Sequence, residues 1–228
     1  MNERNEQTVK NIPVSGLISL PVMESFYTLQ GEGFHQGKAA YFIRLGGCDV
    51  GCTWCDVKES WDPALHPVYS SEEIVYKAVQ LLQDKTGLTN QLTDREAIAV
   101  VTGGEPFMHD CTSLTQQLRA AGFRTHVETS GAYPASGIWD WVCLSPKKFK
   151  SPVPDNILRA DELKVVIFHP SDFEWAEQFA SQVSADCKLF LQPEWGRTDR
   201  ITPLIIDYIK EHPEWRFSIQ LHKYIHVP

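Results

Sequence analysis

Residues 97–104 have the sequence AIAVVTGG, a continuous apolar run that ends in a pair of glycines. Residues 40–47, AYFIRLGG, show the same arrangement earlier in the chain. Continuous apolar runs of this length are typical of strands that are buried on both faces, as in parallel sheets. Each glycine pair marks the point at which a strand gives way to a loop. The two segments therefore predict two buried strands of a largely parallel sheet.

Strand and helix patterns alternate along the rest of the chain. Apolar runs predict further strands at residues 123–128, 139–144, 163–168, 188–192 and 217–221. Amphipathic periodicity predicts helices at residues 70–83, 112–121, 172–183 and 199–211, the first with a Ser70–Glu73 capping box. A full eight-fold barrel takes about 250 residues, and these units fall one or two short of it. We therefore expect an α/β fold, an incomplete TIM-like barrel with mostly parallel strands.

Length and composition limit the class of protein. The chain has 228 residues, 43% of them hydrophobic, which suits one folded domain and excludes global disorder. We expect that domain at residues 21–228, after a weakly ordered extension at residues 1–20. The net charge of −8 argues against a nucleic-acid binder that relies on a basic surface. No apolar run is long enough for a membrane span or a signal peptide, so we expect a cytoplasmic protein without membrane contact.

Three of the six cysteines lie within eight residues, at Cys48, Cys52 and Cys55. A tight group of this kind indicates a metal or redox centre rather than a disulfide scaffold. Three thiolates leave one metal position open, which a catalytic iron–sulfur cluster needs if a ligand is to bind iron directly. A zinc site completed by His66 or by a distant cysteine is the alternative. The other three are expected to be ordinary buried residues: Cys111, Cys143 and Cys187.

Polar and glycine-rich segments follow the predicted strands. Because the active sites of parallel α/β folds lie beyond the carboxyl ends of the strands, we expect these segments to form one joint site. The segments are the cysteine loop, Thr102–Pro106, Glu128–Gly131, Ser145–Lys147, His169–Asp172, Gln192–Trp195 and His222–Tyr224.

The C-x3-C-x2-C spacing after one strand, with Gly103-Gly104-Glu105-Pro106 after the next, resembles the radical S-adenosylmethionine (SAM) superfamily. The resemblance implies that the three cysteines hold a 4Fe-4S cluster whose open iron is chelated by SAM. It also implies that the glycine loop receives the methionine amine, with Glu105 as a candidate acceptor. Reduction of such a cluster cleaves SAM to methionine and a 5′-deoxyadenosyl radical.

A longer series of motifs resembles the 7-carboxy-7-deazaguanine synthase family, from about Met23 to Pro228. The motifs are ESFYTLQGEG (24–33), FIRL (42–45), CTWCD (52–56), TGGEP, ETSG, SPK, LQP and the terminal QLHKYIHVP. The resemblance implies a carbon–nitrogen lyase that converts 6-carboxy-5,6,7,8-tetrahydropterin to 7-carboxy-7-deazaguanine, with loss of ammonia, in queuosine biosynthesis. It also implies a homodimer, Mg²⁺ as a further cofactor, and an external one-electron donor such as a flavodoxin.

The resemblance assigns a set of residues to the pterin substrate. Arg44 offers a bidentate fork for the substrate carboxylate, the alternative being a surface ion pair. The carboxylate of Pro228 is expected to accept from the pterin amino groups, the alternative being a frayed tail. The complete set is Leu29, Gln30, Gly31, Glu32, Arg44, Thr102, His222 and Pro228.

A second set is assigned to SAM by the same resemblance. It comprises Trp54, Cys55, Asp56, Gly103, Gly104, Glu105, Ser145, Pro146, Lys147, Gln192, Pro193, Glu194 and Trp195. Glu128 and Ser130 are expected in the same cleft. For Trp54 the alternative is an ordinary core position. For Ser145–Lys147 it is a solvated turn in which Lys147 and Lys148 both point to solvent.

The chain departs from the family at Val57, where members commonly carry a threonine whose hydroxyl meets Mg²⁺. Valine has no oxygen to offer to this hard cation, so we expect weaker magnesium dependence, with Asp56 as a possible substitute ligand. Two other functions stay open from the sequence. One is a glycyl-radical-enzyme activase of the same superfamily, and the other is a zinc-stabilised binding module without catalysis.

Overall fold

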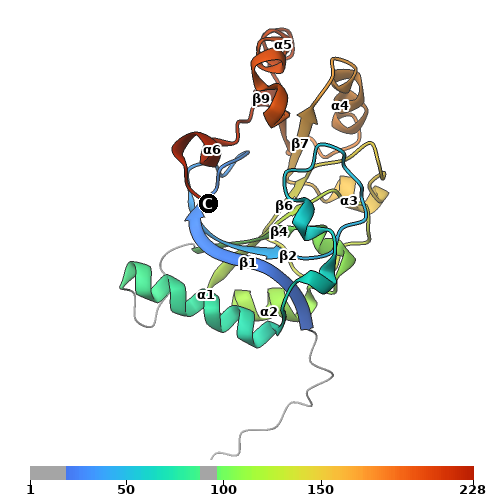
Figure 1. Cartoon of the computed structure of the whole chain (residues 1–228). Coiled ribbons are helices and arrows are strands. Elements are labelled where there is room, and N and C mark those ends of the chain that lie inside the picture. The colour runs from blue at the N-terminus through green and yellow to red at the C-terminus, as the bar shows by residue number, and fades with distance from the viewer. Residues whose placement is uncertain (1–18, 88–96) are drawn as a thin grey trace, which may run out of the picture.

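The structure is a computed structural model that describes residues 19–87 and 97–228. Its strands form one nine-stranded sheet in the order β3-β1-β2-β4-β5-β6-β7-β8-β9. The strands are β1 Ser19–Leu29, β2 Ala39–Leu45, β3 Val68–Ser70, β4 Ala97–Gly103, β5 Phe123–Thr129, β6 Trp141–Leu144, β7 Glu162–Ile167, β8 Lys188–Pro193 and β9 Trp215–Phe217. The α-helices are α1 Ser71–Thr86, α2 Thr112–Ala120, α3 Pro154–Leu158, α4 Asp172–Ala180, α5 Thr198–Glu211 and α6 Leu221–Ile225 (Figure 1).

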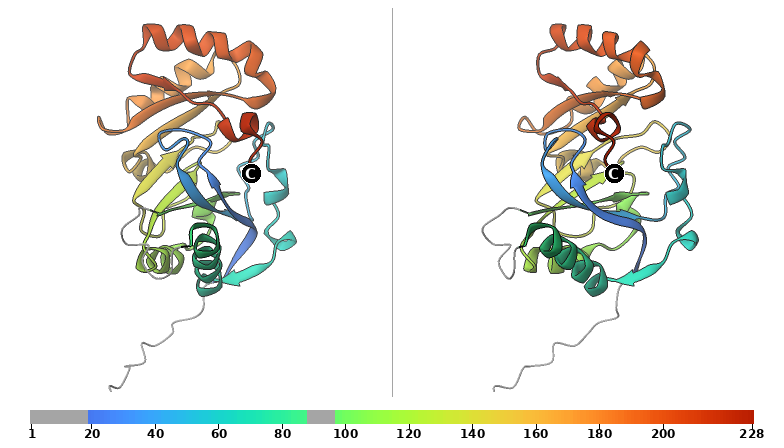
Figure 2. Two further views of the ribbon diagram at one scale, coloured as in Figure 1. Left: turned by 90° about the vertical axis from the view of Figure 1, so that its left-hand side faces the viewer. Right: turned by 60° about the vertical axis from the view of Figure 1, so that its left-hand side comes forward.

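The sheet is the core of an incomplete barrel. From β2 to β9 every pair of neighbouring strands is parallel. At the other edge β1 pairs antiparallel with β2 and with β3. The sheet stays open, because within the described residues β3 and β9 are its two edges. Helix α1 packs on β1 and β3, α2 packs on β5, and α4 and α5 cover the β7–β9 end (Figures 1 and 2). The expected mostly parallel partial barrel is confirmed.

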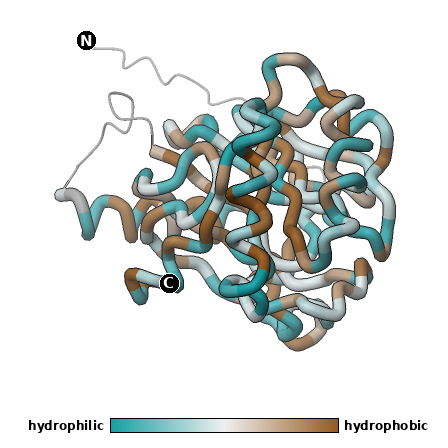
Figure 3. Tube along the Cα trace, turned by 90° about the horizontal axis from the view of Figure 1, so that it is seen from above, coloured by the Kyte–Doolittle hydropathy of each residue, from teal (hydrophilic) through white to brown (hydrophobic). Residues whose placement is uncertain are grey.

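Alternating side chains give each strand an outer and an inner face. On β2 and β4, the outer residues Tyr41, Ile43 and Val101 pack in one core cluster with α1 and α2. The opposite residues Phe42 and Val100 belong to a separate, inner cluster. A second outer core packs β7 and β8 against α4 and α5. Hydrophobic segments accordingly run through the middle of the chain trace, with hydrophilic segments around them (Figure 3).

Polar residues take inner positions on five strands, four of them near the carboxyl end of the strand and Lys164 in the middle of β7. They are Arg44 on β2, Thr102 on β4, Glu128 on β5, Lys164 on β7 and Gln192 on β8, and all of them line one cavity. Parallel register places Arg44 beside Thr102. The apolar outer positions thus hold the fold together, while the inner positions are left for chemistry.

Most predicted elements are confirmed with shifted ends, and two predictions are wrong. Ser19 and Leu20, which we assigned to the extension, begin β1; the rest of that prediction, residues 1–18, lies outside the described residues. The last strand lies at Trp215–Phe217 rather than 217–221, because the fully buried Trp215 packs in the outer core. Leu221, predicted to end that strand, begins α6.

Helix α1 begins as predicted. The Ser70 side chain accepts from the Glu73 backbone N–H, and the Glu73 side chain accepts from the Ser70 N–H. Both bonds satisfy donors that a helix N-terminus otherwise leaves without partners. Among the described residues, no helix combines the length and the apolar character needed to cross a bilayer.

Candidate active site

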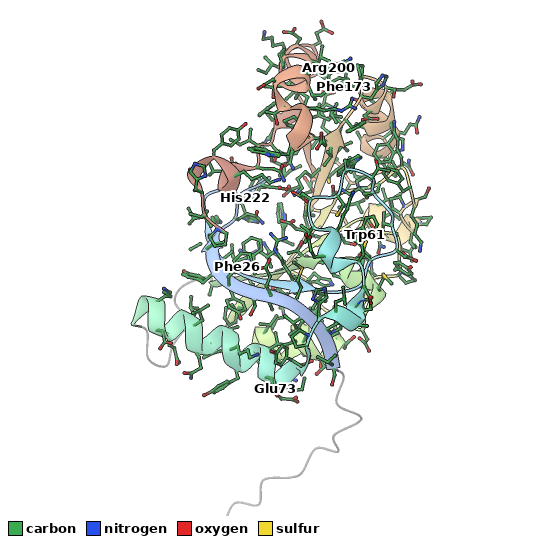
Figure 4. All side chains as sticks on the ribbon, in the orientation of Figure 1. Phe26, Trp61, Glu73, Phe173, Arg200 and His222 are labelled. Atoms are coloured by element: carbon green, nitrogen blue, oxygen red, sulfur yellow. The ribbon has the colours of Figure 1, made fainter. Side chains whose placement is uncertain are left out.

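A cavity of about 560 Å³ opens at the carboxyl ends of the parallel strands. Phe26 and His222 lie on one side of it and Trp61 on the other (Figure 4). The predicted site residues that line the cavity are Leu29, Gln30, Gly31, Glu32, Arg44, Cys48, Cys52, Trp54, Cys55, Asp56, Thr102, Gly103, Gly104, Glu105, Ser145, Lys147, Gln192, His222 and Pro228. Glu128, Ser130 and Val57 line it as well. One pocket thus gathers segments from most of the sequence.

Four residues that we assigned to SAM do not line this cavity: Pro146, Pro193, Glu194 and Trp195. The Glu194 carboxylate instead accepts from the Gly196 N–H at 2.9 Å and caps the turn at Trp195–Arg197. The Trp195 ring packs edge-on against Tyr224, with the ring centres 5.3 Å apart. Of the QPEW segment, the structure therefore brings only the Gln192 side chain to the cavity wall.

The three cysteines of the loop are not arranged around a single-ion site. A tetrahedral zinc site with Zn–S bonds of about 2.3 Å needs sulfurs about 3.8 Å apart. Among the described residues, one group of three His, Cys, Asp or Glu side chains has its ligand atoms within 4.8 Å of one another, and it is Glu177, His212 and Glu214. The three cysteines do not form such a group. His66, one of the two residues considered as a fourth ligand in the alternative zinc site, contacts the Glu59 carbonyl at 2.8 Å.

Backbone hydrogen bonds hold the cysteine loop against the glycine loop. The Glu105 N–H donates to the Gly47 carbonyl at 2.8 Å, and the Gly47 N–H donates to the Ser60 carbonyl at 2.6 Å. A Cβ on Gly104 would lie 2.1 Å from the Gly47 carbonyl oxygen, so this approach requires glycine. Burial raises the pKa of Cys48, and it raises the pKa of Cys52 to about 11, with the neighbouring cysteines adding to the effect. Metal binding must therefore displace protons from these thiols.

The Glu105 carboxylate lines the cavity and is engaged within the protein; that it accepts from a cationic amine stays a prediction. The Glu105 side chain is buried, and each of its oxygens already accepts two hydrogen bonds. One oxygen accepts from the Phe107 N–H and the Thr129 hydroxyl, and the other from the N–H and hydroxyl of Ser130. Glu105 therefore fixes the glycine loop to the end of β5. The backbone of Gly103 and Gly104 also lines the cavity.

The opposite wall of the cavity carries groups suited to a polar heterocycle with a carboxylate. The Arg44 Nε lies 3.1 Å from Glu24, which steadies the guanidinium and leaves its two terminal nitrogens as further donors. The Gln30 amide donates to Glu128 at 2.9 Å and accepts from the Glu32 N–H at 3.0 Å. The ion pair that we weighed as the alternative for Arg44 is present, yet Arg44 also lines the cavity.

The C-terminal segment closes one side of the cavity. The Leu221 N–H donates to the Gly31 carbonyl at 2.9 Å, and Lys223 pairs with Asp56 in the cysteine loop at 2.7 Å. A Cβ on Gly31 would lie 2.1 Å from Nδ1 of His222, so glycine makes room for this ring. Burial lowers the pKa of His222, which favours the neutral imidazole.

Sequence reasoning gave no role to several polar residues of the wall, among them Lys164 and Gln220. Lys164 stands in the middle of the apolar run ELKVVIF, and a lone lysine in a buried strand is the signal that could have found it. Lys147, in contrast, lies where we expected it. Its ammonium contacts Ser145 at 2.5 Å and lies 5.4 Å from the ring centre of Trp54, while Lys148 pairs with Asp172 outside the cavity.

No family model matches the chain. It is 52% identical over 209 residues to the 7-carboxy-7-deazaguanine synthase of Flavobacterium psychrophilum, covering 92% of this chain and 93% of that protein. The enzymes of the same name from Synechocystis and Escherichia coli K12 are 45% and 33% identical, over 94% and 91% of this chain and 98% of each relative. The chain belongs to the 7-carboxy-7-deazaguanine synthase family. The crystal structure of QueE from Escherichia coli matches with a TM-score of 0.73 and 31% identity, over 90% of this chain and 95% of that one.

The residues at the family's magnesium position do not fit a magnesium ion held by the protein. Val57 lines the cavity but has no side-chain oxygen, and the neighbouring Asp56 carboxylate is paired with the Lys223 ammonium. The hydrogen bond and charge of Lys223 outweigh the effect of burial and hold the pKa of Asp56 below its usual value. Mg²⁺ needs oxygen ligands in near-octahedral geometry, so a carboxylate already neutralised by a lysine is a poor substitute.

Val57→Thr is expected to increase the response of the initial rate to magnesium. Threonine has the shape of valine and adds the hydroxyl oxygen that a hard cation can use. The measurement is the rate as a function of magnesium concentration, after chelator treatment, for both forms. A strong magnesium requirement in the native protein that Val57→Thr leaves unaltered would contradict this expectation.

Proposed function

We propose that this protein is a radical SAM lyase that converts 6-carboxy-5,6,7,8-tetrahydropterin to 7-carboxy-7-deazaguanine with loss of ammonia, in queuosine biosynthesis. The observation that carries the proposal is that, in a chain of this family, one cavity joins two kinds of wall. The cysteine and glycine loops form the first, and Arg44, Gln30, Glu32 and His222 belong to the second. A glycyl-radical-enzyme activase or a zinc module would have no use for the second wall.

The donor set of the first wall fits a 4Fe-4S cluster with SAM as its fourth ligand. Cys48, Cys52 and Cys55 would hold the cluster, and the Gly103-Gly104 backbone would receive the methionine part of SAM. When bound, this pair supplies the hydrogen abstraction that starts the rearrangement. Lys147 and Trp54 lie beside Ser145 at the same end of the cavity, where they would flank the cofactor.

The residues of the second wall would bind and orient the substrate. The terminal nitrogens of Arg44 would donate two parallel hydrogen bonds to the substrate carboxylate. Glu32 and Glu128 present acceptors to the N–H groups of the pterin, and the neutral His222 ring closes the pocket over Gly31. The C-terminal segment would exclude water from this space, which protects a reactive intermediate from quenching.

The proposal includes a homodimer and an external one-electron donor such as a flavodoxin. The family resemblance supports both. The external donor is also needed because the side chains that line the cavity cannot supply an electron to a cluster. Magnesium, the remaining family cofactor, would have to bind through substrate oxygens and water, because the residues at positions 56 and 57 do not fit it. No step of the proposed mechanism is assigned to it.

Turnover tests the function directly. Anaerobically reconstituted protein, with SAM and a chemical reductant, is expected to release 7-carboxy-7-deazaguanine and ammonia from 6-carboxytetrahydropterin. A brown protein that cleaves SAM but leaves the pterin unchanged would overturn the substrate assignment. A colourless protein with stoichiometric zinc would overturn the cluster assignment.

Arg44→Lys is expected to lower kcat/KM for the carboxypterin by about 10- to 100-fold. Lysine keeps the charge but loses the planar fork that matches a carboxylate with two parallel hydrogen bonds. The matched control is Arg119→Lys, since Arg119 pairs with Asp140 outside the cavity. Equal kcat/KM values for the Arg44 and Arg119 variants would show that Arg44 does not bind the substrate.

A further inference from the structure

Lys164 is a buried cation that the proposed mechanism has not used. Lys164 lies in the middle of β7 and is only 4% exposed. Val165 and Ile167, on the same strand, belong to the outer core. Moving an ammonium group out of water costs free energy, and its attraction to a buried carboxylate does little more than offset that cost. A buried ion pair is therefore weak evidence that the lysine is there to stabilise the fold. Val165 and Ile167 show that β7 readily takes aliphatic residues. The presence of a lysine on the inner face therefore points to the cavity.

The ammonium of Lys164 joins two carboxylates from distant parts of the chain. Its Nζ hydrogen-bonds to one oxygen of Glu32, in the loop after β1, and lies 3.8 Å from an oxygen of Glu128 on β5. All three residues line the cavity. Among the cavity residues, Lys164 thus occupies the point at which β5, β7 and the loop after β1 meet.

The other oxygens of these carboxylates are held by amides. The Gln220 amide donates to Glu32 at 2.9 Å, and the Gln30 amide donates to Glu128 at 2.9 Å. Each carboxylate is therefore fixed from one side by Lys164 and from the other by an amide. These contacts fix the orientation of each carboxylate, and so the direction in which its remaining lone pairs can accept hydrogen bonds.

The charge of Lys164 also keeps the Glu32 carboxylate ionised. Burial would raise the pKa of Glu32, but the charge and hydrogen bond of Lys164 lower it to about 2. Burial likewise would lower the pKa of Lys164, but the surrounding acidic groups, Cys143, Glu128 and Glu32 among them, raise it well above its usual value. Without the cation, burial would favour the protonated form of Glu32, and this carboxylate would turn from an acceptor into a donor.

We propose that Lys164 is a positioning residue that holds Glu32 and Glu128 as a pair of fixed hydrogen-bond acceptors for the N–H-rich edge of a 2-amino-4-oxopyrimidine ring. The inference rests on the proposed function, since a pterin carries this ring. It adds that recognition of the ring depends on a lysine that acts through the two glutamates. An ionised carboxylate can accept hydrogen bonds but cannot donate them. A ring that presents acceptor atoms in place of these N–H groups would therefore be rejected.

The test is the binding of 6-carboxypterin, the stable oxidised form of the substrate, followed by its fluorescence in cluster-loaded protein. Lys164→Met is expected to weaken binding by about 10- to 100-fold, the range that a hydrogen bond to a charged group is worth. Iron content and SAM binding are expected to stay at native values. Lys164→Arg should restore binding to within about threefold of native, because it keeps the charge near both glutamates.

Two further variants separate positioning from folding. Lys148→Met is the matched control, because Lys148 pairs with Asp172 outside the cavity and should bind the pterin like the native protein. Lys164→Gln still donates hydrogen bonds but carries no charge, so it should bind as weakly as Lys164→Met and gives the same readout if the methionine variant does not fold. Native affinity in Lys164→Met or in Lys164→Gln would overturn the inference. If the native, cluster-loaded protein itself fails to bind 6-carboxypterin, the proposed function fails instead.

Discussion

Replacing Cys48, Cys52 or Cys55 with alanine is expected to abolish turnover and to remove the iron–sulfur absorbance. Each variant deletes one of three thiolates that would hold the cluster, and the nearest histidine in the sequence, His66, is engaged with the Glu59 carbonyl. A cluster left with two protein ligands would be lost or unable to bind SAM at a defined iron. Iron content, the visible spectrum and product formation after anaerobic reconstitution measure the effect.

Cys187→Ser is the matched control for these variants. Cys187 is buried in the outer core near α4 and α5, away from the cavity. Placing a hydroxyl there is expected to cost about 1–3 kcal/mol of folding free energy, with iron content and turnover unchanged. Full turnover by an alanine variant of Cys48, Cys52 or Cys55 would contradict the cluster assignment. Loss of iron in Cys187→Ser would show that the cysteine variants report on folding rather than on ligation.

The parts of the fold that local sequence determines could be predicted. The Ser70–Glu73 capping box needs only residues three apart, and it forms as expected. The buried strands β2, β4 and β7 follow from their apolar runs, since each is covered by helices on its outer face. Strand β1 could not be recognised in this way. Much of it is only half-buried, so its pattern has no clear period, and it is defined by its pairing with β2 and β3.

The candidate site could be predicted as a set of loops but not as a network. Arg44, Thr102 and the cysteines stand at strand ends, and parallel topology alone brings strand ends together. The roles of Glu105 and Lys164 depend on partners far along the chain. Glu105 bonds to Thr129 and Ser130, and Lys164 bonds to Glu32, which lies 132 residues away. No local pattern contains these contacts, so the partners of Glu105 were not expected and the lysine was overlooked.

Gly104→Ala is expected to disable the protein although it leaves the three cluster thiolates in place. The new Cβ would lie 2.1 Å from the carbonyl oxygen and 2.7 Å from the carbonyl carbon of Gly47, closer than van der Waals contact permits. Both obstructing atoms are backbone, so no side chain can rotate out of the way. The cysteine loop must move, and the hydrogen bond from the Glu105 N–H to the Gly47 carbonyl is the first to be lost.

The cost of that movement falls on both stability and the cluster. Overpacking costs about 1–3 kcal/mol and a lost backbone hydrogen bond about 1 kcal/mol, so Gly104→Ala should lower the unfolding free energy by about 2–4 kcal/mol. For a domain of this size, that corresponds to a Tm lower by about 5–15 °C. Displacing Gly47 also moves its neighbour Cys48, so iron content should fall in protein that is still folded at 20–25 °C.

Gly87→Ala separates this steric effect from the general cost of replacing a glycine. Gly87 ends α1 with a φ of 66° and has no atom within 4 Å of an added Cβ. An alanine there costs about 1–2 kcal/mol for the left-handed backbone and leaves the cavity untouched, so iron content and turnover should stay native. Gly104 has no positive φ, so its alanine variant isolates the clash with Gly47. Native iron content and Tm in Gly104→Ala would mean that the two loops can separate freely, and that the cysteine loop does not depend on the glycine loop for its position.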